Sequence, residues 1–321
     1  MVSPELPPAL AAGIDALVEG PSRARLEATA RRLSDAYRAE GGGRVARTAD
    51  DAAAYAAYRA PATYAAVAAV LSQVRLQRPE WRPRSLLDVG AGPGVASWAA
   101  LDAWPSLERV TLVEAEPELA ALGRRLAAAG VPALAGGEWV VGDIDAATGS
   151  FDLVLASYVL NELEEARLDE VVGGLWARTA DTFVVVEPGT TTGYRRALAA
   201  RSLVLAAGGT TLAPCPHDAP CPLVAPDWCH FGVRLPRGEA HRAVKAVSRG
   251  FEDEKFSYAA LTRSPARRAA ARIIRPLQIR SGHVHLDLCE PAGIRDAIVS
   301  KRDRDRYRRA RKSAWGDAWE E

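Results

Sequence analysis

A glycine-rich segment early in the chain has the spacing of a cofactor-binding loop. Asp88 is followed at every second position by Gly90, Gly92 and Gly94, and an apolar run that begins at Ser85 precedes it. Glycine lets a backbone turn sharply and approach a ligand closely because it has no Cβ atom. In doubly wound α/β proteins a ligand lies over such a turn between a strand and a helix. The segment therefore predicts a bound cofactor above this turn.

Polar residues follow the next predicted strands. Glu114 lies twenty residues after Gly94, where a carboxylate can accept both hydroxyl hydrogens of a ribose. Asp143 is placed to meet an adenine amino group, although a turn residue or a helix cap would have the same sequence signature. We add Ser157, at the end of the fourth predicted strand, to the predicted cofactor-binding residues.

The spacing favours S-adenosylmethionine over a dinucleotide. A dinucleotide-binding loop reads Gly-x-Gly-x-x-Gly, but here Pro93 intervenes and Val95 occupies the sixth position. The segment Ala156–Glu162 lacks the Asn/Asp-Pro-Pro-aromatic sequence of many amino-group methyltransferases, and it has no cysteine that could attack a pyrimidine. We therefore predict a class I S-adenosylmethionine-dependent methyltransferase fold, a Rossmann-like doubly wound sheet, and identify no catalytic residue.

The four cysteines of the chain are concentrated, three within fifteen residues and one at the end of a later predicted strand: Cys215, Cys221, Cys229 and Cys289. Thiolates repel one another unless a cation holds them, so this pattern predicts a metal site with four cysteine ligands. The wide intervals and the Cys-Pro dipeptides favour an iron–sulfur cluster over zinc, whose cysteines usually lie two to four residues apart. Zinc, with His217 or His230 as a replacement ligand, and four ordinary buried thiols stay open as alternatives.

Positive charge gathers towards the end of the chain. Between Arg263 and Lys312 there are fifteen Lys or Arg against five Asp or Glu, although the whole chain carries only +1. A basic region on an otherwise acidic chain indicates a polyanionic partner, and the planar guanidinium suits phosphate contacts. The predicted RNA-binding residues are Arg267, Arg268, Arg272, Arg275, Arg304, Arg308, Arg309, Arg311 and Lys312. A solvated, partly helical tail is the alternative.

Residues 1–80 are predicted to be a helical region. Apolar spacing near 3.6 indicates helices over Leu6–Val18 and Ala24–Ala39, and Thr48 with an aspartate three residues later is a capping pattern for another helix. Pro61 is predicted to break that helix, which then resumes over Ala62–Gln77.

Residues 81–207 alternate short apolar runs with helical patterns, as in a parallel sheet. The predicted strands are Ser85–Val89, Arg109–Glu114, Glu138–Val141, Phe151–Ser157 and Thr182–Val186. The predicted helices are Val95–Ala103, Pro117–Ala129, Glu162–Arg178 and Thr192–Ala207. Residues 208–240, here called the cysteine segment, are predicted to be an insertion. Residues 241–299 should hold the last two core strands, Lys255–Thr262 and His283–Leu288, and 300–321 a basic tail.

Composition limits the classes of protein. With 321 residues, 48% of them hydrophobic, the chain can bury a large core. It contains no apolar run of about 18 residues, and its first ten residues lack the basic start and apolar run of a signal peptide. We therefore expect no membrane partner and a cytoplasmic location. Four cysteines are too few for a disulfide scaffold, and the oligomeric state is not predictable.

Several segments together resemble one family. They are Arg59–Ala66, Leu87–Gly94, Val184–Gly189, Cys215–Asp218, Cys221–Leu223, Asp227–Phe231, Ser281–Cys289 and Ala310–Asp317. As a set they are similar to the methyltransferase-like proteins of mitochondrial small-ribosomal-subunit assembly, the family of methyltransferase-like protein 17 and its yeast and bacterial relatives. The resemblance implies maturation of the small ribosomal subunit, an S-adenosylmethionine pocket, and a [4Fe–4S] cluster held by the four cysteines.

The expected function is that of an S-adenosylmethionine-binding, iron–sulfur-containing, methyltransferase-like protein that acts on or with small-subunit ribosomal RNA. Two alternatives remain at this point. One is a small-molecule methyltransferase with a structural zinc site made by the four cysteines, and the other is an assembly factor without catalysis.

Overall fold

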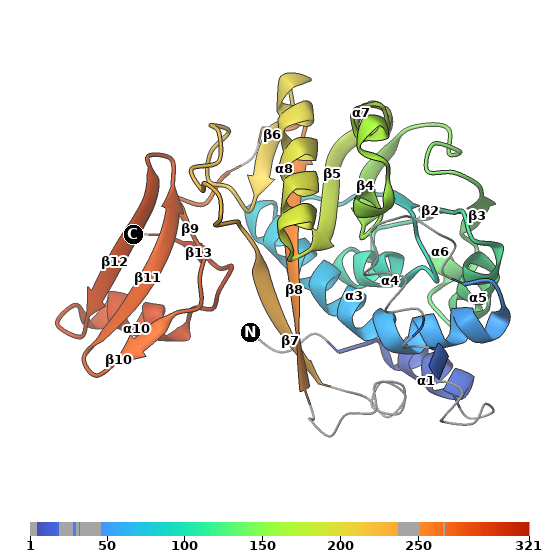
Figure 1. Ribbon diagram of the computed structural model, residues 1–321, viewed down its shortest axis with the longest axis horizontal. Coiled ribbons are helices and arrows are strands. Elements are labelled where there is room, and N and C mark those ends of the chain that lie inside the picture. Colours follow the sequence, from blue (N-terminus) through green and yellow to red (C-terminus); the bar gives the residue numbers. More distant parts are fainter. Residues whose placement is uncertain are drawn as a thin grey trace.

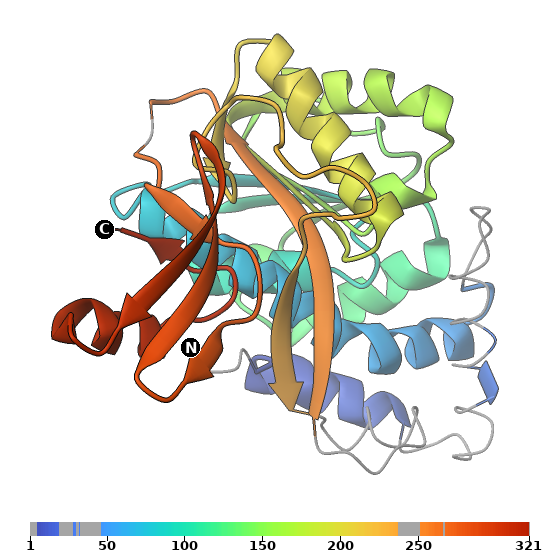
Figure 2. The ribbon, with the colours of Figure 1, turned by 60° about the vertical axis from the view of Figure 1, so that its left-hand side comes forward.

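The structure is a computed structural model that describes residues 5–18, 28, 29, 32, 46–236, 251–265 and 267–320. An eight-stranded main sheet lies between two layers of helices, and a smaller five-stranded sheet lies beside it, at the left of Figure 1. Figure 2, turned by 60°, brings this smaller sheet forward. The helix predicted over Ala24–Ala39 falls almost wholly outside the described residues.

The main sheet has the strand order β3-β2-β1-β4-β5-β8-β6, and β7 also pairs with β8. The strands β1 to β5 are parallel, whereas β8 runs antiparallel to β5, β6 and β7. Their bounds are β1 Ser85–Val89, β2 Arg109–Glu114, β3 Glu138–Val141, β4 Phe151–Ser157, β5 Thr179–Pro188, β6 Thr210–Ala213, β7 Phe231–Pro236 and β8 Phe251–Thr262. A reversed strand between the fifth and the sixth is the class I methyltransferase arrangement, so the predicted core fold is confirmed. The chain winds outward in both directions from β1, so the crevice between the ends of β1 and β4 is the expected ligand site.

Helices cover both faces of the main sheet. On one face lie α1 (Pro8–Val18), α3 (Ala49–Gln77), α4 (Val95–Ala103), α5 (Pro117–Ala128) and α6 (Pro132–Ala135). On the other lie α7 (Leu168–Arg178) and α8 (Thr191–Ala206). Alternate residues of a strand point to opposite faces, so Leu86 packs in the first layer and Leu87 in the second. Two short 3-10 helices, η1 (Leu160–Glu162) and η2 (Glu165–Arg167), connect β4 to α7.

The long helix α3 corrects one prediction. Thr48 caps it by accepting the N–H of Asp51 at 3.2 Å, as the capping pattern indicated. Pro61 was predicted to break the helix but lies inside it. Proline in a helix costs about 3 kcal/mol through its missing N–H and a clash with the preceding turn. Sixteen residues of α3 are buried, among them Val67, Val70 and Leu71, and that apolar burial outweighs the local cost.

The smaller sheet corrects a second prediction, the placement of the last strands and of residues 300–321. It has the order β10-β11-β9-β13, and β12 pairs with β11. Its elements are β9 Ala271–Ile273, β10 Gln278–Arg280, β11 His283–Glu290, β12 Gly293–Ser300, α10 Arg304–Lys312 and β13 Ala318–Trp319. The strand predicted at His283–Leu288 was assigned to the main sheet, and residues 300–321 to a tail. Instead β11 pairs with β12 along eight residues, and α10 packs with β13 against the small sheet's own core of Leu286, Val299 and Trp319.

Candidate functional site

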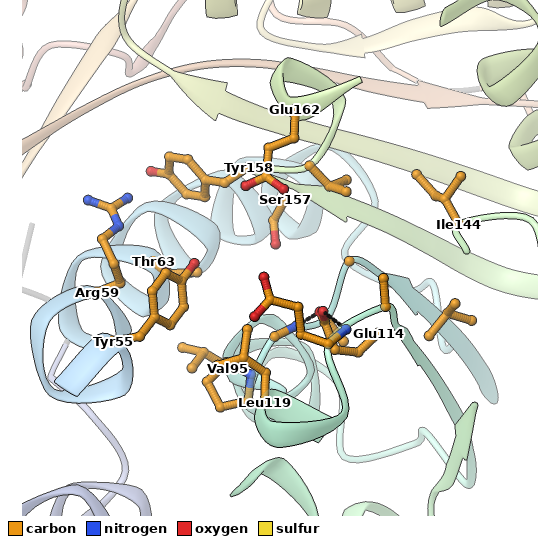
Figure 3. Close-up of a pocket in the computed structure, with 18 of the residues that line it drawn as sticks. Tyr55, Arg59, Thr63, Val95, Glu114, Leu119, Ile144, Ser157, Tyr158 and Glu162 are labelled. Carbon is orange, nitrogen blue, oxygen red and sulfur yellow. Dashed lines mark hydrogen bonds between the residues drawn. The ribbon is translucent and has the colours of Figure 1, made fainter. Parts of the chain in front are cut away.

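A cavity of about 360 Å³ opens at the C-terminal ends of the central parallel strands (Figure 3). Its wall combines the glycine loop after β1, the end of β2, the turns after β3 and β4, and one side of α3. This is the crevice that the strand order predicts for a ligand, and its volume falls in the range of small-molecule sites.

The glycine loop has the backbone that its sequence predicts. Gly90, Gly92 and Gly94 have φ of 62°, 54° and 80°, which lie in the left-handed region that favours glycine. A Cβ at Gly90 would lie 2.4 Å from Val159 Cγ2, so the loop packs closely against the turn after β4. Gly92 faces the cavity more openly, since its Cβ would meet nothing nearer than Tyr55 at 4.0 Å. Gly94 caps α4 and does not line the cavity.

Asp88 lies beneath the loop rather than in the cavity wall. Its side chain is fully buried, and Oδ2 accepts a hydrogen bond from Ser97 Oγ of α4 at 2.7 Å. Burial raises the pKa of Asp88 to about 7. Its other oxygen, Oδ1, is buried without a hydrogen-bond partner among the described residues. The prediction that Asp88 binds cofactor directly is therefore wrong in its geometry, because the carboxylate holds the loop to α4.

Glu114 joins the end of β2 to the glycine loop. Its Oε2 accepts the N–H of Gly92 at 2.6 Å, and its Oε1 accepts the N–H of Glu116 at 2.8 Å. These bonds are the dashed lines in Figure 3, where the carboxylate lies at the cavity floor, across from Ser157 and Glu162. Burial, and to a smaller extent the neighbouring Glu116 carboxylate, raise the pKa of Glu114 above its ordinary value, although its backbone hydrogen bonds act to lower it. A carboxylate fixed by two backbone donors still has lone pairs for ligand hydroxyl groups.

Asp143 and Ser157 also line the cavity. Asp143 is half exposed, and its Oδ1 accepts the N–H of Ile144 at 2.7 Å while its Oδ2 pairs with Arg167 at 2.9 Å. The Ile144 N–H and the guanidinium lower the pKa of Asp143, so it remains ionised. Ser157 is buried at the end of β4. Six of the seven predicted cofactor residues thus lie at or beside the cavity, and five of them line it.

The sequence analysis missed the contribution of α3 and of the turn after β4. Tyr55, Arg59 and Thr63 project from α3 into the cavity (Figure 3). Arg59 donates to Glu254 Oε1 at 3.1 Å and lies over the ring of Tyr158, whose hydroxyl donates to the same oxygen at 2.9 Å. The one sequence signal for this part of the cavity was the segment Arg59–Ala66, which belongs to the set that resembles the family. The φ of 59° at Tyr158 has no signal in the sequence.

The cysteines come together from distant parts of the chain. Cys215, Cys221 and Cys229 lie between β6 and β7, and Cys289 lies on β11 of the smaller sheet. Burial raises the pKa of Cys215, Cys229 and Cys289, and further increases come from neighbouring cysteines of the same set. Cys289 Sγ also lies 3.7 Å from His217 Nε2. The thiols therefore share one region. The described part of the chain nevertheless contains no group of three or more His, Cys, Asp or Glu side chains arranged to hold a metal ion.

The predicted RNA-binding arginines divide into two groups. Arg272 is 1% exposed, so its prediction as an RNA contact is wrong. Arg268 and Arg275 pair with Asp218 and Asp227 of the cysteine segment, and Arg267 lies 3.7 Å from Glu320. The remaining residues lie on α10 and are exposed: Arg304, Arg308, Arg309, Arg311 and Lys312. Among the described helices, none has the length and apolarity needed to cross a membrane.

Comparison with known proteins gives the following matches. Residues 49–320 match the family model described as mitochondrial small ribosomal subunit Rsm22. The human mitochondrial ribosome assembly protein METTL17 is 32% identical over 285 residues, covering 82% of this chain and 61% of the human protein. A mitochondrial Rsm22-cox11 tandem protein of Schizosaccharomyces pombe is 27% identical over 318 residues, covering 82% of this chain and 42% of its own length. This chain thus spans less than two thirds of either relative.

Among solved structures, magnesium protoporphyrin IX methyltransferase from Synechocystis has 13% identity and a TM-score of 0.43, covering 75% of this chain and 95% of that one. The curated relatives correct the expected location. Both are named as mitochondrial proteins, which contradicts the predicted cytoplasmic location.

Proposed function

Because this chain belongs to the mitochondrial small ribosomal subunit Rsm22 family, we propose that it binds S-adenosylmethionine and acts on or with small-subunit ribosomal RNA in ribosome assembly. The human relative is named as a ribosome assembly protein, and we extend that role to this chain. The observation that carries the cofactor part of the proposal is the anchored carboxylate of Glu114 in the cavity wall.

The residues of the cavity fit S-adenosylmethionine. Glu114 would accept the ribose hydroxyl hydrogens, and Asp143 would accept from the adenine amino group. The left-handed turn at Gly90 and Gly92 leaves no Cβ between the backbone and a ligand. When bound, the cofactor would supply an electrophilic methyl group.

The wall opposite the glycine loop would receive the methyl acceptor. Arg59 is held by Glu254 and by the ring of Tyr158, so its guanidinium is positioned before any ligand arrives. The planar guanidinium has five N–H donors, so it could still donate to a phosphate oxygen of an acceptor such as RNA beside its bond to Glu254. Ser157, at the end of β4, and Tyr158, the next residue, line the same cavity.

Two measurements on the full chain test this part. Titration calorimetry should detect binding of S-adenosylmethionine, and a chain that binds none would refute the cofactor proposal. Transfer of labelled methyl groups to isolated small-subunit RNA would then separate an enzyme from an assembly factor that binds the cofactor without catalysis.

We also propose that the four cysteines hold a [4Fe–4S] cluster, with zinc as the alternative. The fit rests on the chemistry of the donors: burial and neighbouring cysteines raise the pKa of Cys215, Cys229 and Cys289, and a bound metal would take the place of the thiol protons. In a cluster each thiolate binds a different iron, so the sulfur atoms need not surround a single point. The site would join the loop between β6 and β7 to β11.

Metal analysis decides between these two occupants. Anaerobically purified protein should contain iron and acid-labile sulfide and absorb visible light. One zinc per chain without iron would favour the small-molecule methyltransferase with a structural zinc site.

For the RNA we propose that the exposed side of α10 is the contact surface. Its helix carries five exposed cations, and only Ala310 is buried. The bidentate geometry of arginine suits phosphate oxygens.

A further inference from the structure

Two arginines lie buried where the cysteine segment meets the smaller sheet. Arg201, on α8, is 3% exposed and donates to Thr211 Oγ1 at 3.2 Å, to the carbonyl of His217 at 2.7 Å and to that of Ala219 at 3.0 Å. It therefore holds the turn that separates Cys215 from Cys221.

Arg272, on β9, is the counterpart from the smaller sheet. It donates to the carbonyl of Pro214 at 2.8 Å and to that of Gly316 at 3.0 Å, and it also bonds the side chain of Gln73. Pro214 directly precedes Cys215. In the pairing of β9 with β11, Arg272 lies directly opposite Cys289. Directly opposed residues share a face of a sheet, so this guanidinium and this thiol leave their strands on the same side.

Every acceptor of these two guanidiniums is neutral. Among the described residues, neither arginine forms an ion pair. The nearby carboxylates are engaged elsewhere, because Asp218 pairs with Arg268 and Asp317 accepts the N–H of Ala314 at 2.8 Å. A buried charge without a counter-charge is strongly unfavourable. Neither Asp218 nor Asp317 bonds to these guanidiniums, which favours a further negatively charged group within their reach.

We propose that Arg201 and Arg272 are positioning residues that supply the counter-charge for a metal-loaded, thiolate form of the four cysteines. The inference rests on the proposed four-cysteine centre. Four thiolates with one zinc ion, or with an oxidised [4Fe–4S] cluster, carry two negative charges in total, and the two guanidiniums carry two positive ones. Binding of the metal would therefore cancel the two positive charges where the cysteine segment meets the smaller sheet. Four protonated thiols would leave both arginines without a counter-charge.

The test asks whether the charge of Arg272 or its hydrogen bonds matter for the retention of bound metal. Arg272→Gln removes the charge, and Arg272→Lys keeps it while losing the planar fork. After anaerobic reconstitution of the full chain with iron and sulfide, or with zinc, the bound metal is challenged with a chelator. Loss of a supporting charge should weaken retention by about 10- to 100-fold in Arg272→Gln, and Arg272→Lys should stay close to the unmodified protein.

Arg178→Gln is the matched control. Arg178, on α7, also donates only to neutral acceptors, including the carbonyls of Ala147 and Gly174, and lies partly exposed beside the loop between β3 and β4. Its replacement should leave metal retention unchanged. The pair Arg201→Gln and Arg201→Lys repeats the comparison from a different element, in case Arg272→Gln does not fold.

The outcomes separate the two proposals. If the unmodified chain binds neither metal, the four-cysteine centre is refuted and this inference falls with it. If the chain binds metal and the Gln variants retain it as well, only the role of the arginines is refuted. Equal losses in the Lys and Gln variants would show that hydrogen bonding matters and charge does not, which would also overturn the inference. In an iron–sulfur protein the Gln variants should further show a more negative reduction potential, because a nearby positive charge favours the added electron.

Discussion

The carboxylate of Glu114 accepts the backbone N–H of Gly92 at 2.6 Å, which joins the end of β2 to the loop after β1. This bond holds the two sides of the cavity floor at a set separation. Because Glu116 donates to the other oxygen at 2.8 Å, the carboxylate cannot rotate away. The loop and the residue proposed for the ribose are therefore one unit, and a change in either should disturb ligand binding.

The first prediction concerns Gly92. A valine there would place a β-branched side chain at φ 54°, in the direction of the cavity, where the nearest atom to a Cβ is Tyr55 at 4.0 Å. We expect Gly92→Val to fold but to lose S-adenosylmethionine binding by at least about 10-fold, a change of roughly 1.4 kcal/mol. Titration calorimetry measures the affinity, and an unchanged value would remove the loop from the site.

Gly149→Val is its control. Gly149 also has a positive φ, 94°, and a Cβ there would meet nothing within 4 Å. Both variants carry the backbone strain of a left-handed residue, about 1–2 kcal/mol. Similar melting temperatures with different ligand affinities would assign the effect to the cavity rather than to strain.

Much of the main sheet could be predicted from the sequence. The strands β1 to β4 match their predicted bounds because each is a short apolar run bounded by turn residues, the strongest signal for a buried strand. The break expected at Pro61 was wrong because a local rule competed with the burial of an entire helix. Likewise β6 and β7 were not predicted, since their pairing with β8 depends on distant partners.

A second prediction follows from Glu187, which lies at the end of β5 and has no exposed surface. It accepts the N–H of Leu160 at 2.9 Å and of Asn161 at 3.2 Å, so it holds η1 beside the cavity. Burial raises the pKa of Glu187 to about 8 from an ordinary value of 4.5. The stability contributed by its protonated form is complete below pH 4.5 and is lost as the pH rises through about 8.

In Glu187→Gln an NH2 group replaces one of the two accepting oxygens, so the variant loses a hydrogen bond at every pH. Its melting temperature relative to the unmodified protein should nevertheless rise from pH 5 to pH 8, because only the unmodified protein loses stability over that range. Thermal unfolding followed by circular dichroism at both pH values measures this. Asp152→Asn provides the control, because Asp152 also accepts backbone N–H bonds but is more exposed. The same difference in melting temperature at both pH values would mean that Glu187 is ionised in the folded protein.

The third prediction concerns Cys289, the only one of the four thiols on the smaller sheet. Cys289→Ala should release the metal and lower the melting temperature, because a metal that binds only the folded state stabilises it. Leu288→Ala is the control, because Leu288 directly precedes Cys289 on β11 and is fully buried on the opposite face of the sheet. It should destabilise the protein by about 2–5 kcal/mol and retain the metal. Equal metal content in both variants would exclude Cys289 as a ligand.

The cysteine pattern and the basic stretch were visible in the sequence, but their positions were not. Arg272 and Arg304 belong to one run of positive charge, yet Arg272 is buried at the junction and Arg304 is exposed at the start of α10. Charge patterning does not separate a buried cation from a solvated one, because burial depends on which strands pair. Arg272 is buried because its strand, β9, pairs with both β11 and β13.

The last prediction tests α10 as an RNA surface. Removing residues 300–321 would be a poor test, because Trp319 is fully buried and β13 pairs with β9. Substitution avoids this problem, since Arg304 and Arg311 are exposed and their helix is anchored by Ala310. The double variant Arg304→Gln, Arg311→Gln should bind small-subunit RNA more weakly and with a smaller dependence on salt. Each lost phosphate contact should reduce the slope of log K against log salt by about 0.7 for single strands.

The double variant Arg82→Gln, Arg84→Gln is the matched control for this experiment. Both side chains are exposed, at 60% and 70%, and both precede β1 rather than lying on the smaller sheet. The control removes the same amount of charge, so an effect of net charge alone would appear equally in both double variants. Binding measured at several salt concentrations should show a reduced slope for the α10 variant and an unchanged slope for the control. Equal slopes in the two variants would mean that α10 is a solvated helix and that the RNA, if bound, lies elsewhere on the protein.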